Sequence, residues 1–127
     1  MLVLDSTVLI DYLRGQGVAD RVDSALEAGE TLATTSINVE EIVRGLRSGE
    51  EAAARLLFGG LVVLDIGRRE GWLAGEWRRA AVSKGTTLSQ ADCLIAATVW
   101  TAGARLATAN VSDFAPTPVA VEEWPPT

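Results

Sequence analysis

The stretch Met1-Leu2-Val3-Leu4-Asp5 decides the fold class, because a run of aliphatic residues leads directly into a carboxylate. Such a continuous apolar run is typical of a strand that is buried on both faces, as in parallel sheets. In an open parallel sheet, ligands bind beyond the carboxyl ends of the strands, where the strand order reverses. Asp5 is therefore the first candidate for a functional carboxylate. The alternative interpretation is that Asp5 simply caps the following helix, since Asp is a good N-cap residue.

The rest of the chain alternates apolar strand patterns with amphipathic helix patterns. We expect helices at residues 18–28, 37–48, 50–58, 67–84 and 89–102, and further strands at residues 31–35, 61–64, 104–107 and 119–121. The run 61–64 is expected to be buried like the first strand, and residues 108–114 to form a loop. Each crossover is long enough for parallel pairing, so the pattern predicts one three-layer α/β/α domain over residues 1–127, with a mostly parallel sheet of four or five strands.

The composition excludes several kinds of active site. The chain of 127 residues contains no histidine, which removes Ser-His-Asp, Cys-His and paired-histidine ribonuclease chemistry. With no histidine and only Cys93 as a thiol, we expect neither an ordinary zinc site nor an internal disulfide, and the lone cysteine fits the reducing cytoplasm. Seventeen acids against eleven bases leave hard cations held by carboxylates as the main option. No segment has the pattern of a signal peptide or a transmembrane helix, so we expect no membrane association.

Asp92 is the acid that most needs an explanation. It is the only charged residue between Lys84 and Arg105, in a helix otherwise made of apolar and small residues. If Ser89 is the N-cap, Asp92 occupies the first turn, close to the edge of the apolar stripe. An unpaired carboxylate in a buried helix costs several kcal/mol unless it is paired, protonated or metal-bound. The alternative is a first-turn Asp that is favoured only by the helix dipole, worth about 0.3–1 kcal/mol.

Two further acidic positions stay ambiguous by pattern alone. The apolar stripe of helix 37–48 centres on Val39, Val43 and Leu46, so Glu41 points away from it and Glu40 is an equal candidate. After the strand at 104–107, the segment 108–113 places Thr108, Asn110 and Asp113 near a second strand end. That segment is equally well explained as an ordinary turn, since Asn and Asp favour turn geometry.

The helix that contains residues 68–79 carries four arginines and two tryptophans, namely Arg68, Arg69, Arg78, Arg79, Trp72 and Trp77. Exposed aromatic side chains beside arginine suit single-stranded RNA, through stacking and phosphate contacts. The interpretation that we prefer is that the tryptophans pack in the core or in a dimer interface and that the arginines are solvated.

Taken together, four ordered blocks resemble the PIN-domain family, and in size and layout the VapC-type toxin ribonucleases of toxin–antitoxin pairs. The resemblance spans essentially the whole chain. The blocks are Leu2-Val3-Leu4-Asp5-Ser6-Thr7, then Glu41-Ile42-Val43-Arg44-Gly45 preceded by Thr35-Ser36, then residues 88–97 around Ser89-Gln90-Ala91-Asp92, and finally residues 106–114 from Leu106 to Phe114. No block is specific alone, but four in this order are.

The resemblance implies a set of site residues and a chemistry. It selects Glu41 over Glu40 and implies that Asp5, Glu41, Asp92 and Asp113 are the catalytic, metal-binding acids, supported by Thr7, Thr108 and Asn110. It implies Mg²⁺ or Mn²⁺ as the cofactor, and hydrolysis of RNA that leaves 5′-phosphate and 3′-hydroxyl ends. The family often has Arg between the Thr and the Asn of the last block, whereas this chain has Ala109, so one RNA-contacting base is missing.

The resemblance also implies partners. They are single-stranded or looped RNA, with tRNA among the candidates, a cognate antitoxin and a second copy of the chain in a homodimer. Two other α/β phosphoryl-transfer families fit poorly: a haloacid-dehalogenase-type phosphatase needs an Asp where Thr7 stands, and a response-regulator receiver needs a Lys on a late strand. The remaining rival is a catalytically silent interaction module with the same fold.

Overall fold

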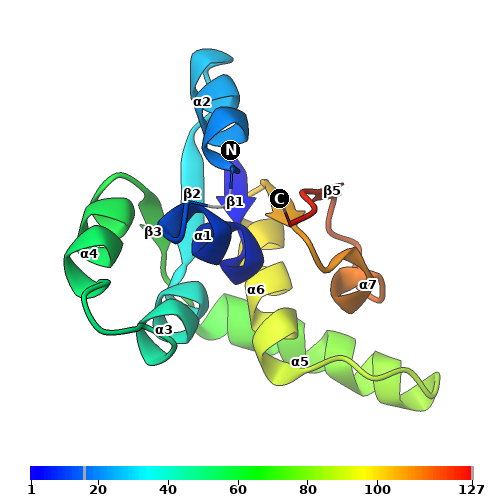
Figure 1. The fold of residues 1–127 in the computed structure, drawn as a ribbon. Coiled ribbons are helices and arrows are strands. Elements are labelled where there is room, and N and C mark those ends of the chain that lie inside the picture. Colours follow the sequence, from blue (N-terminus) through cyan, green and yellow to red (C-terminus); the bar gives the residue numbers. More distant parts are fainter. Residues whose placement is uncertain (16, 127) are drawn as a thin grey trace.

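The core of the protein is a five-stranded, wholly parallel sheet. The computed structural model describes residues 1–15 and 17–126. The strands lie in the order β3-β2-β1-β4-β5 (Figure 1). Their bounds are β1 Leu2–Leu4, β2 Leu32–Thr35, β3 Val62–Leu64, β4 Arg105–Thr108 and β5 Val121–Glu123. The predicted α/β class and parallel sheet are therefore confirmed, with five strands.

Helices connect the strands and cover both faces of the sheet. Their bounds are α1 Ser6–Leu13, α2 Ala19–Glu27, α3 Ser36–Arg44, α4 Glu51–Gly59, α5 Arg68–Ser83, α6 Gln90–Thr101 and α7 Val111–Phe114. The strand β1 shows why two helical layers are needed, because its side chains alternate between faces. Leu2 and Leu4 pack in a core cluster with residues of α1, α2 and α3, whereas Val3 packs in a second cluster with residues of α6 and α7.

The connectivity places a switch point at the carboxyl end of β1. From β1 the chain first moves to β2 on one side, and it later enters β4 on the other side, so β1 lies between two strands reached in opposite directions. Crevices at such a position are the usual ligand sites of open parallel sheets. The residues that follow the central strands, Asp5 after β1 and Ser36 after β2, together with Thr108 at the end of β4, meet at this edge.

Four local predictions need correction. The strand at 61–64 is not buried: β3 is an edge strand, and Val62 and Val63 are 44% and 37% exposed. The helix predicted at 37–48 ends at Arg44, with Gly45 as its C-cap. Residues 108–114 contain the short helix α7 rather than only a loop. The last strand begins two residues later than predicted, at Val121.

Within residues 1–15 and 17–126, none of the helices combines the length and the apolar character needed to cross a bilayer.

Candidate active site

Asp5 occupies the N-cap position of α1 but its side chain does not cap the helix. The carboxylate is 6% exposed and accepts hydrogen bonds from three side chains instead. Asn38 Nδ2 donates to Oδ1 at 3.1 Å, and Thr108 Oγ1 donates to Oδ2 at 2.7 Å. Thr7 Oγ1 also donates to Oδ2, at 3.5 Å. Both carboxylate oxygens are therefore oriented by side chains from α1, α3 and β4, so the capping interpretation accounts for the position of Asp5 but not for its contacts.

Asn38 links the site to the start of α3, and sequence reasoning did not identify it. Its side chain is fully buried, and its Oδ1 accepts from the hydroxyl of Thr35 at 2.8 Å and from the backbone N–H of Thr35 at 3.3 Å. The Thr35 hydroxyl in turn accepts from the Asn38 backbone N–H, which completes a capping box. Asn38 Nδ2 donates both to Asp5 and to Ser6 Oγ, the latter at 3.0 Å. The sequence carried a signal for this contact. Capping boxes have the pattern Ser/Thr-x-x-Glu/Gln, and Thr35-x-x-Asn38 has the same spacing with Asn in the last position.

Glu41 lies one turn after Asn38 and faces the same side of α3. It is half-buried and accepts a hydrogen bond from Ser6 Oγ at 2.7 Å. Its neighbour Glu40 is exposed and pairs with Arg44 at 2.8 Å on the solvent side. The buried residues of α3 are Asn38 and Ile42, whereas Val43 is 54% exposed. The buried face of the helix therefore differs from the apolar stripe that the sequence predicted and lies nearer to the side that carries Asn38 and Glu41. The structure thus turns Glu41, not Glu40, toward Asp5.

Asp92 occupies the third position of α6, whose N-cap is Ser89. The Ser89 hydroxyl accepts the backbone N–H of Asp92 at 3.1 Å, so the helix start is fixed as the sequence predicted. The Asp92 side chain is half-buried, and the negative charges of Asp113 and Asp5 act on it. Asp113 lies in α7 and is exposed, at the rim of the same group.

The predicted supporting residues differ in what they do. Thr7 and Thr108 are joined through their hydroxyl oxygens, 3.4 Å apart, and both contact Asp5. The Ala109 backbone N–H donates to Thr7 Oγ1 at 3.0 Å. Asn110 contributes its backbone N–H, which donates to Thr108 Oγ1 at 3.0 Å, while the residue itself is exposed. The two threonines therefore contact the Asp5 carboxylate directly, whereas Asn110 is linked to it only through Thr108.

The carboxylates of this site are held in a state that resists ionisation. Burial raises the pKa of Asp5 above its ordinary value, and hydrogen bonds from its neighbours only partly offset that effect. Burial also raises the pKa of Glu41, to which the charges of Asp5 and Asp92 add. For Asp92, burial is again the main cause of a raised pKa, followed by the charges of Asp113 and Asp5. Carboxylates of this kind are candidates for a functional role, since structural acids are normally paired with bases.

The donor set suits a hard divalent cation. Within residues 1–15 and 17–126, no three acidic or cysteine side chains converge as a ready-made metal cage. Mg²⁺ does not require one, because it keeps several water ligands and is commonly held by one or two carboxylates. Asp5 has the properties expected of a ligand for such an ion: it is nearly fully buried, and the described hydrogen bonds to its carboxylate all come from neutral groups. The oxygen-only chemistry and the mutual repulsion of the acids both fit Mg²⁺ or Mn²⁺.

Comparisons with known proteins agree with this arrangement. A family model described as PIN domain matches residues 2–116. Ribonuclease VapC19 of Mycobacterium tuberculosis is 34% identical over 119 residues, which cover 90% of this chain and 92% of that protein. Among solved structures, VapBC2 from Rickettsia felis, bound to a DNA fragment from its promoter, aligns with a TM-score of 0.84 at 22% identity, over 97% and 98% of the two chains. A toxin–antitoxin complex from Klebsiella pneumoniae aligns with a TM-score of 0.78 at 25% identity, over 96% of each chain.

The solved structures below 25% identity bear on the fold alone, and they carry the same α/β arrangement over nearly the whole chain. The family assignment comes from the matched domain and from the relative that shares a third of its residues with this chain. This chain therefore belongs to the PIN-domain family, in its VapC ribonuclease group.

Proposed function

We propose that this VapC-type ribonuclease hydrolyses RNA phosphodiester bonds as a metal-dependent endonuclease, and that it acts as the toxin of a type II toxin–antitoxin pair. One observation supports the site above all others: Asp5, Glu41 and Asp92 come from three separate elements and repel one another at a single edge of the sheet. A fold tolerates such an arrangement when a bound cation compensates the charge.

Each neighbouring residue has a distinct task in the proposed mechanism. Asn38 and Thr108 hold the Asp5 carboxylate in one orientation, with one donor on each oxygen. Ser6 holds Glu41 in the same way. Asp5, Glu41 and Asp92 are the proposed ligands of Mg²⁺ or Mn²⁺, and Asp113 closes the set from the exposed rim. When bound, the ion supplies Lewis-acid chemistry, which activates water and stabilises negative charge on the phosphate.

The proposed reaction needs no side-chain nucleophile and no histidine. The protein contributes oxygen ligands that are oriented in advance and threonine hydroxyls that hold Asp5 in place. It places no basic side chain among the described hydrogen-bond donors to Asp5, so its charge is not neutralised there. This is the chemistry that the composition left open, because the chain contains no histidine and its one thiol, on Cys93, is fully buried.

A cognate antitoxin is the proposed protein partner. Solved relatives of this fold are described as toxin–antitoxin complexes, from Klebsiella pneumoniae among others. An acidic site without bases favours a segment with Arg or Lys that neutralises the carboxylates and blocks the substrate. We also propose a homodimer, which is what the resemblance to VapC-type toxins implies. Exposed apolar side chains such as Leu56 on α4 and Trp100 on α6 are available for its interface.

The deciding experiment is cleavage of total RNA and of a folded tRNA pool by purified, antitoxin-free protein with Mg²⁺, Mn²⁺ or EDTA. We expect cutting that requires metal and that is lost in Asp5→Asn and in Asp92→Asn. Glu40→Gln is the matched control, because Glu40 stands beside Glu41 but faces solvent. Metal-independent cutting, or equal loss in the Glu40 variant, would refute the assignment of the site. A protein that neither cuts RNA nor gains thermal stability with metal would instead be the silent interaction module.

A further inference from the structure

Positive charge is concentrated on one helix of this acidic protein. The segment 68–84, which is α5 with its C-cap Lys84, contains five bases and two acids, a net +3 in a chain whose net charge is −6. In the described part of the chain, the arginines that form ion pairs all lie elsewhere, namely Arg14, Arg44, Arg55 and Arg105. None of the five bases of segment 68–84 forms an ion pair with the described acids.

The stability of α5 itself does not explain these bases. Arg68 and Arg69 stand in the first turn, where the helix dipole favours acids and opposes bases. Glu76 stands one turn before Arg79 on the same helix, but the described salt bridges include no pair between Glu76 and either Arg78 or Arg79. The charges are therefore available to an outside partner, and a negatively charged one matches them.

The carboxyl-terminal half of α5 is attached to the loop that leads into α6. Arg78 Nε donates to the carbonyl oxygen of Leu88 at 3.1 Å, one residue before the N-cap of the helix that carries Asp92. Figure 1 shows the loop that follows α5 running back along α5 to the start of α6. Arg78 is thus attached to the loop that precedes the N-cap of α6 and Asp92.

Two surface hollows lie between these bases and segments next to the site. One, of about 280 Å³, is lined by Arg78, Arg79, Thr86, Thr87 and Leu88. The other, of about 560 Å³, is lined by Lys84 and Thr86 on one side and by Ala115 and Pro116 on the other, directly after the α7 helix that bears Asp113. The surface formed by Arg78, Arg79, Lys84, Thr86 and Thr87 is called the basic surface below. It therefore adjoins the loop that leads to Asp92 and the segment that follows Asp113.

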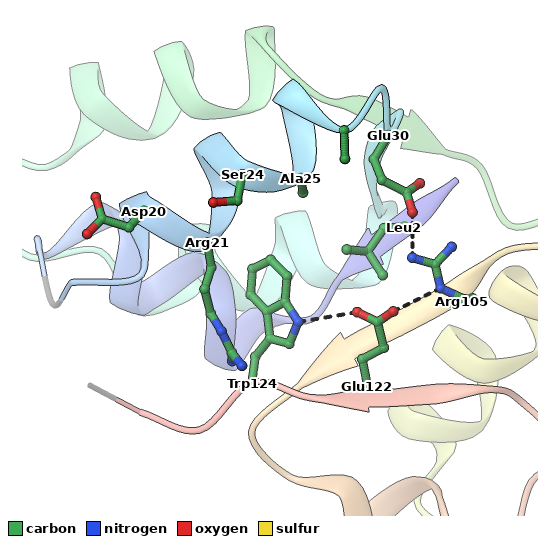
Figure 2. A pocket seen from close by; sticks show the side chains of 10 residues that line it. Leu2, Asp20, Arg21, Ser24, Ala25, Glu30, Arg105, Glu122 and Trp124 are labelled. Atoms are coloured by element: carbon green, nitrogen blue, oxygen red, sulfur yellow. Dashed lines mark hydrogen bonds and ion pairs between the residues drawn. The ribbon is translucent and has the colours of Figure 1, made fainter.

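A hollow away from α5 that is also lined by arginines offers no comparable free charge. It has a volume of about 400 Å³ and lies at the amino-terminal edge of the sheet, where Arg105 pairs with Glu30 and Glu122 (Figure 2). Arg21 lines the same hollow with its guanidinium 5.2 Å from the ring centre of Trp124. The cations there are already engaged within the protein, so an anion finds free partners on the basic surface and not in this hollow.

An exposed aromatic ring extends the basic surface. Trp72 is 72% exposed and stands seven residues before Arg79, which places both on one face of α5, about 10 Å apart along the axis. Single-stranded nucleic acids bind to this combination, with phosphates on the bases and a nucleobase stacked on the ring.

We propose that the basic surface of α5, with Trp72, binds the backbone of single-stranded RNA and guides it to the acidic site. This inference rests on the proposed ribonuclease function for its substrate, but its test measures binding and not cleavage. Arg79 and Lys84 contact phosphates, Thr86 and Thr87 lie beside them, and Arg78 fixes the surface to the Asp92 loop.

The test is equilibrium binding of a fluorescein-labelled, mixed-sequence single-stranded RNA in EDTA, followed by anisotropy over a range of salt concentrations. Each phosphate contact with single strands contributes about 0.7 to the slope of log affinity against log salt, so Arg79→Gln with Lys84→Gln lowers the slope by about 1.4. If the double variant and the wild type bind RNA equally at 1 M salt, this difference in slope makes the variant bind about 25-fold more weakly than the wild type at 0.1 M salt. Arg21→Gln with Arg47→Gln removes the same charge elsewhere and is expected to leave the slope within about 0.3 of the wild type.

Trp72→Ala adds an independent arm. Loss of stacking weakens binding about fivefold or more, but it leaves the salt slope unchanged because no counterion is involved. Equal losses in both double variants would overturn the proposal, because they would indicate only the net charge of the protein. Unchanged RNA binding in the Arg79 and Lys84 variant, with a changed oligomeric state or antitoxin affinity, would overturn it in favour of a protein interface. Wild-type protein that binds RNA by this pattern yet never cuts it would refute the proposed nuclease while leaving the binding surface intact.

Discussion

The substitution Asn38→Ala is predicted to destabilise the fold strongly, although Asn38 is not one of the acids. The side chain is fully buried and makes four hydrogen bonds, two as donor to Asp5 and Ser6 and two as acceptor from Thr35. Alanine removes all four and leaves the backbone N–H of Thr35 and one oxygen of Asp5 without these partners. These four bonds tie together the end of β2, the start of α1 and the start of α3, so one substitution loosens all three.

The magnitude follows from the hydrogen bonds that alanine cannot make. A hydrogen bond to a charged group contributes about 1.5–3 kcal/mol, and a buried donor left unpaired costs about 1–3 kcal/mol. Loss of the capping box at α3 adds about 1 kcal/mol. Because neighbouring groups relax, we expect a net loss of about 3–5 kcal/mol in the free energy of unfolding. For a chain of this length that corresponds to a fall of about 10–20 °C in the thermal midpoint.

Asn38→Asp separates packing from electrostatics. It has the same shape and keeps the hydrogen bonds of the acceptor oxygen, but it places a second carboxylate 3.1 Å from Asp5. Two full charges at that distance repel by about 5 kcal/mol at an effective dielectric constant of 20, which is an upper bound because the pair can share a proton. The folded state then binds a proton more tightly than the unfolded state, so the variant gains stability relative to wild type as the pH falls.

The assay is urea unfolding in EDTA, followed by circular dichroism at several pH values between 4 and 8. A loss below about 1 kcal/mol for Asn38→Ala would refute the assigned hydrogen-bond network. If the loss in the free energy of unfolding of Asn38→Asp relative to wild type does not change with pH, charge repulsion is not its cause. Shape alone then accounts for the requirement for Asn. The control is Asn110→Ala, an exposed asparagine whose side chain makes none of the described hydrogen bonds; we expect its effect to stay within about 0.5 kcal/mol.

Further predictions concern the acids and α5. Mg²⁺ or Mn²⁺ at about 100 times its Kd is expected to stabilise wild type by about 2.7 kcal/mol and to leave Asp5→Asn unchanged in thermal melts; equal shifts would contradict the proposed ligand. The pKa of Asp5 is raised above its ordinary value of 3.8, so in EDTA the protonated carboxyl contributes stability that is fully present below pH 3.8 and is lost as the pH rises through the folded-state pKa. The free energy of unfolding of Asp5→Asn relative to wild type is therefore expected to increase with pH. A difference that is independent of pH would contradict this. Glu41→Gln is expected to abolish metal-dependent RNA cutting and Glu40→Gln to preserve it, as product gels can show; the reverse result would reassign the acid. Gly75→Ala, at a helical position where an added Cβ meets nothing within 4 Å, is expected to raise the free energy of unfolding by about 0.5–1 kcal/mol, and destabilisation would indicate that another molecule packs there.

The parallel sheet and the position of Asp5 could be predicted because they depend on short-range patterns. An apolar run followed by an acid determines both the strand and the place where it ends, and the serine before Asp92 sets the start of α6. The exposure of β3 could not be predicted in this way. Val62 and Val63 have the composition of an inner strand, but only the strand order reveals that one side of β3 has no neighbouring strand.

The orientation of α3 explains why the site was harder to predict than the fold. Periodicity treats Asn38 as polar and Val43 as apolar, yet Asn38 is buried and Val43 is exposed, because hydrogen bonds to Asp5 and Ser6 outweigh the burial of one valine. That rotation carries Glu41 inward with Asn38. Only the family resemblance selected Glu41 in the sequence, since the contact that rotates the helix is made across 33 residues of chain.

The site combines rigidity with electrostatic strain, and the two properties require each other. Burial raises the pKa of Asp5, Glu41 and Asp92, and neighbouring negative charges add to this effect at Glu41 and Asp92. The acids therefore weaken the fold at neutral pH when nothing compensates them. The acids would relieve that strain by moving apart if their supports were soft. Neutral donors prevent this movement: Asn38 and Thr108 hold Asp5, and Ser6 holds Glu41, without adding the positive charge that would remove the attraction for a cation. A positively charged donor would stabilise the acids but reduce their attraction for a cation, so neutral amide and hydroxyl donors suit a site that holds one.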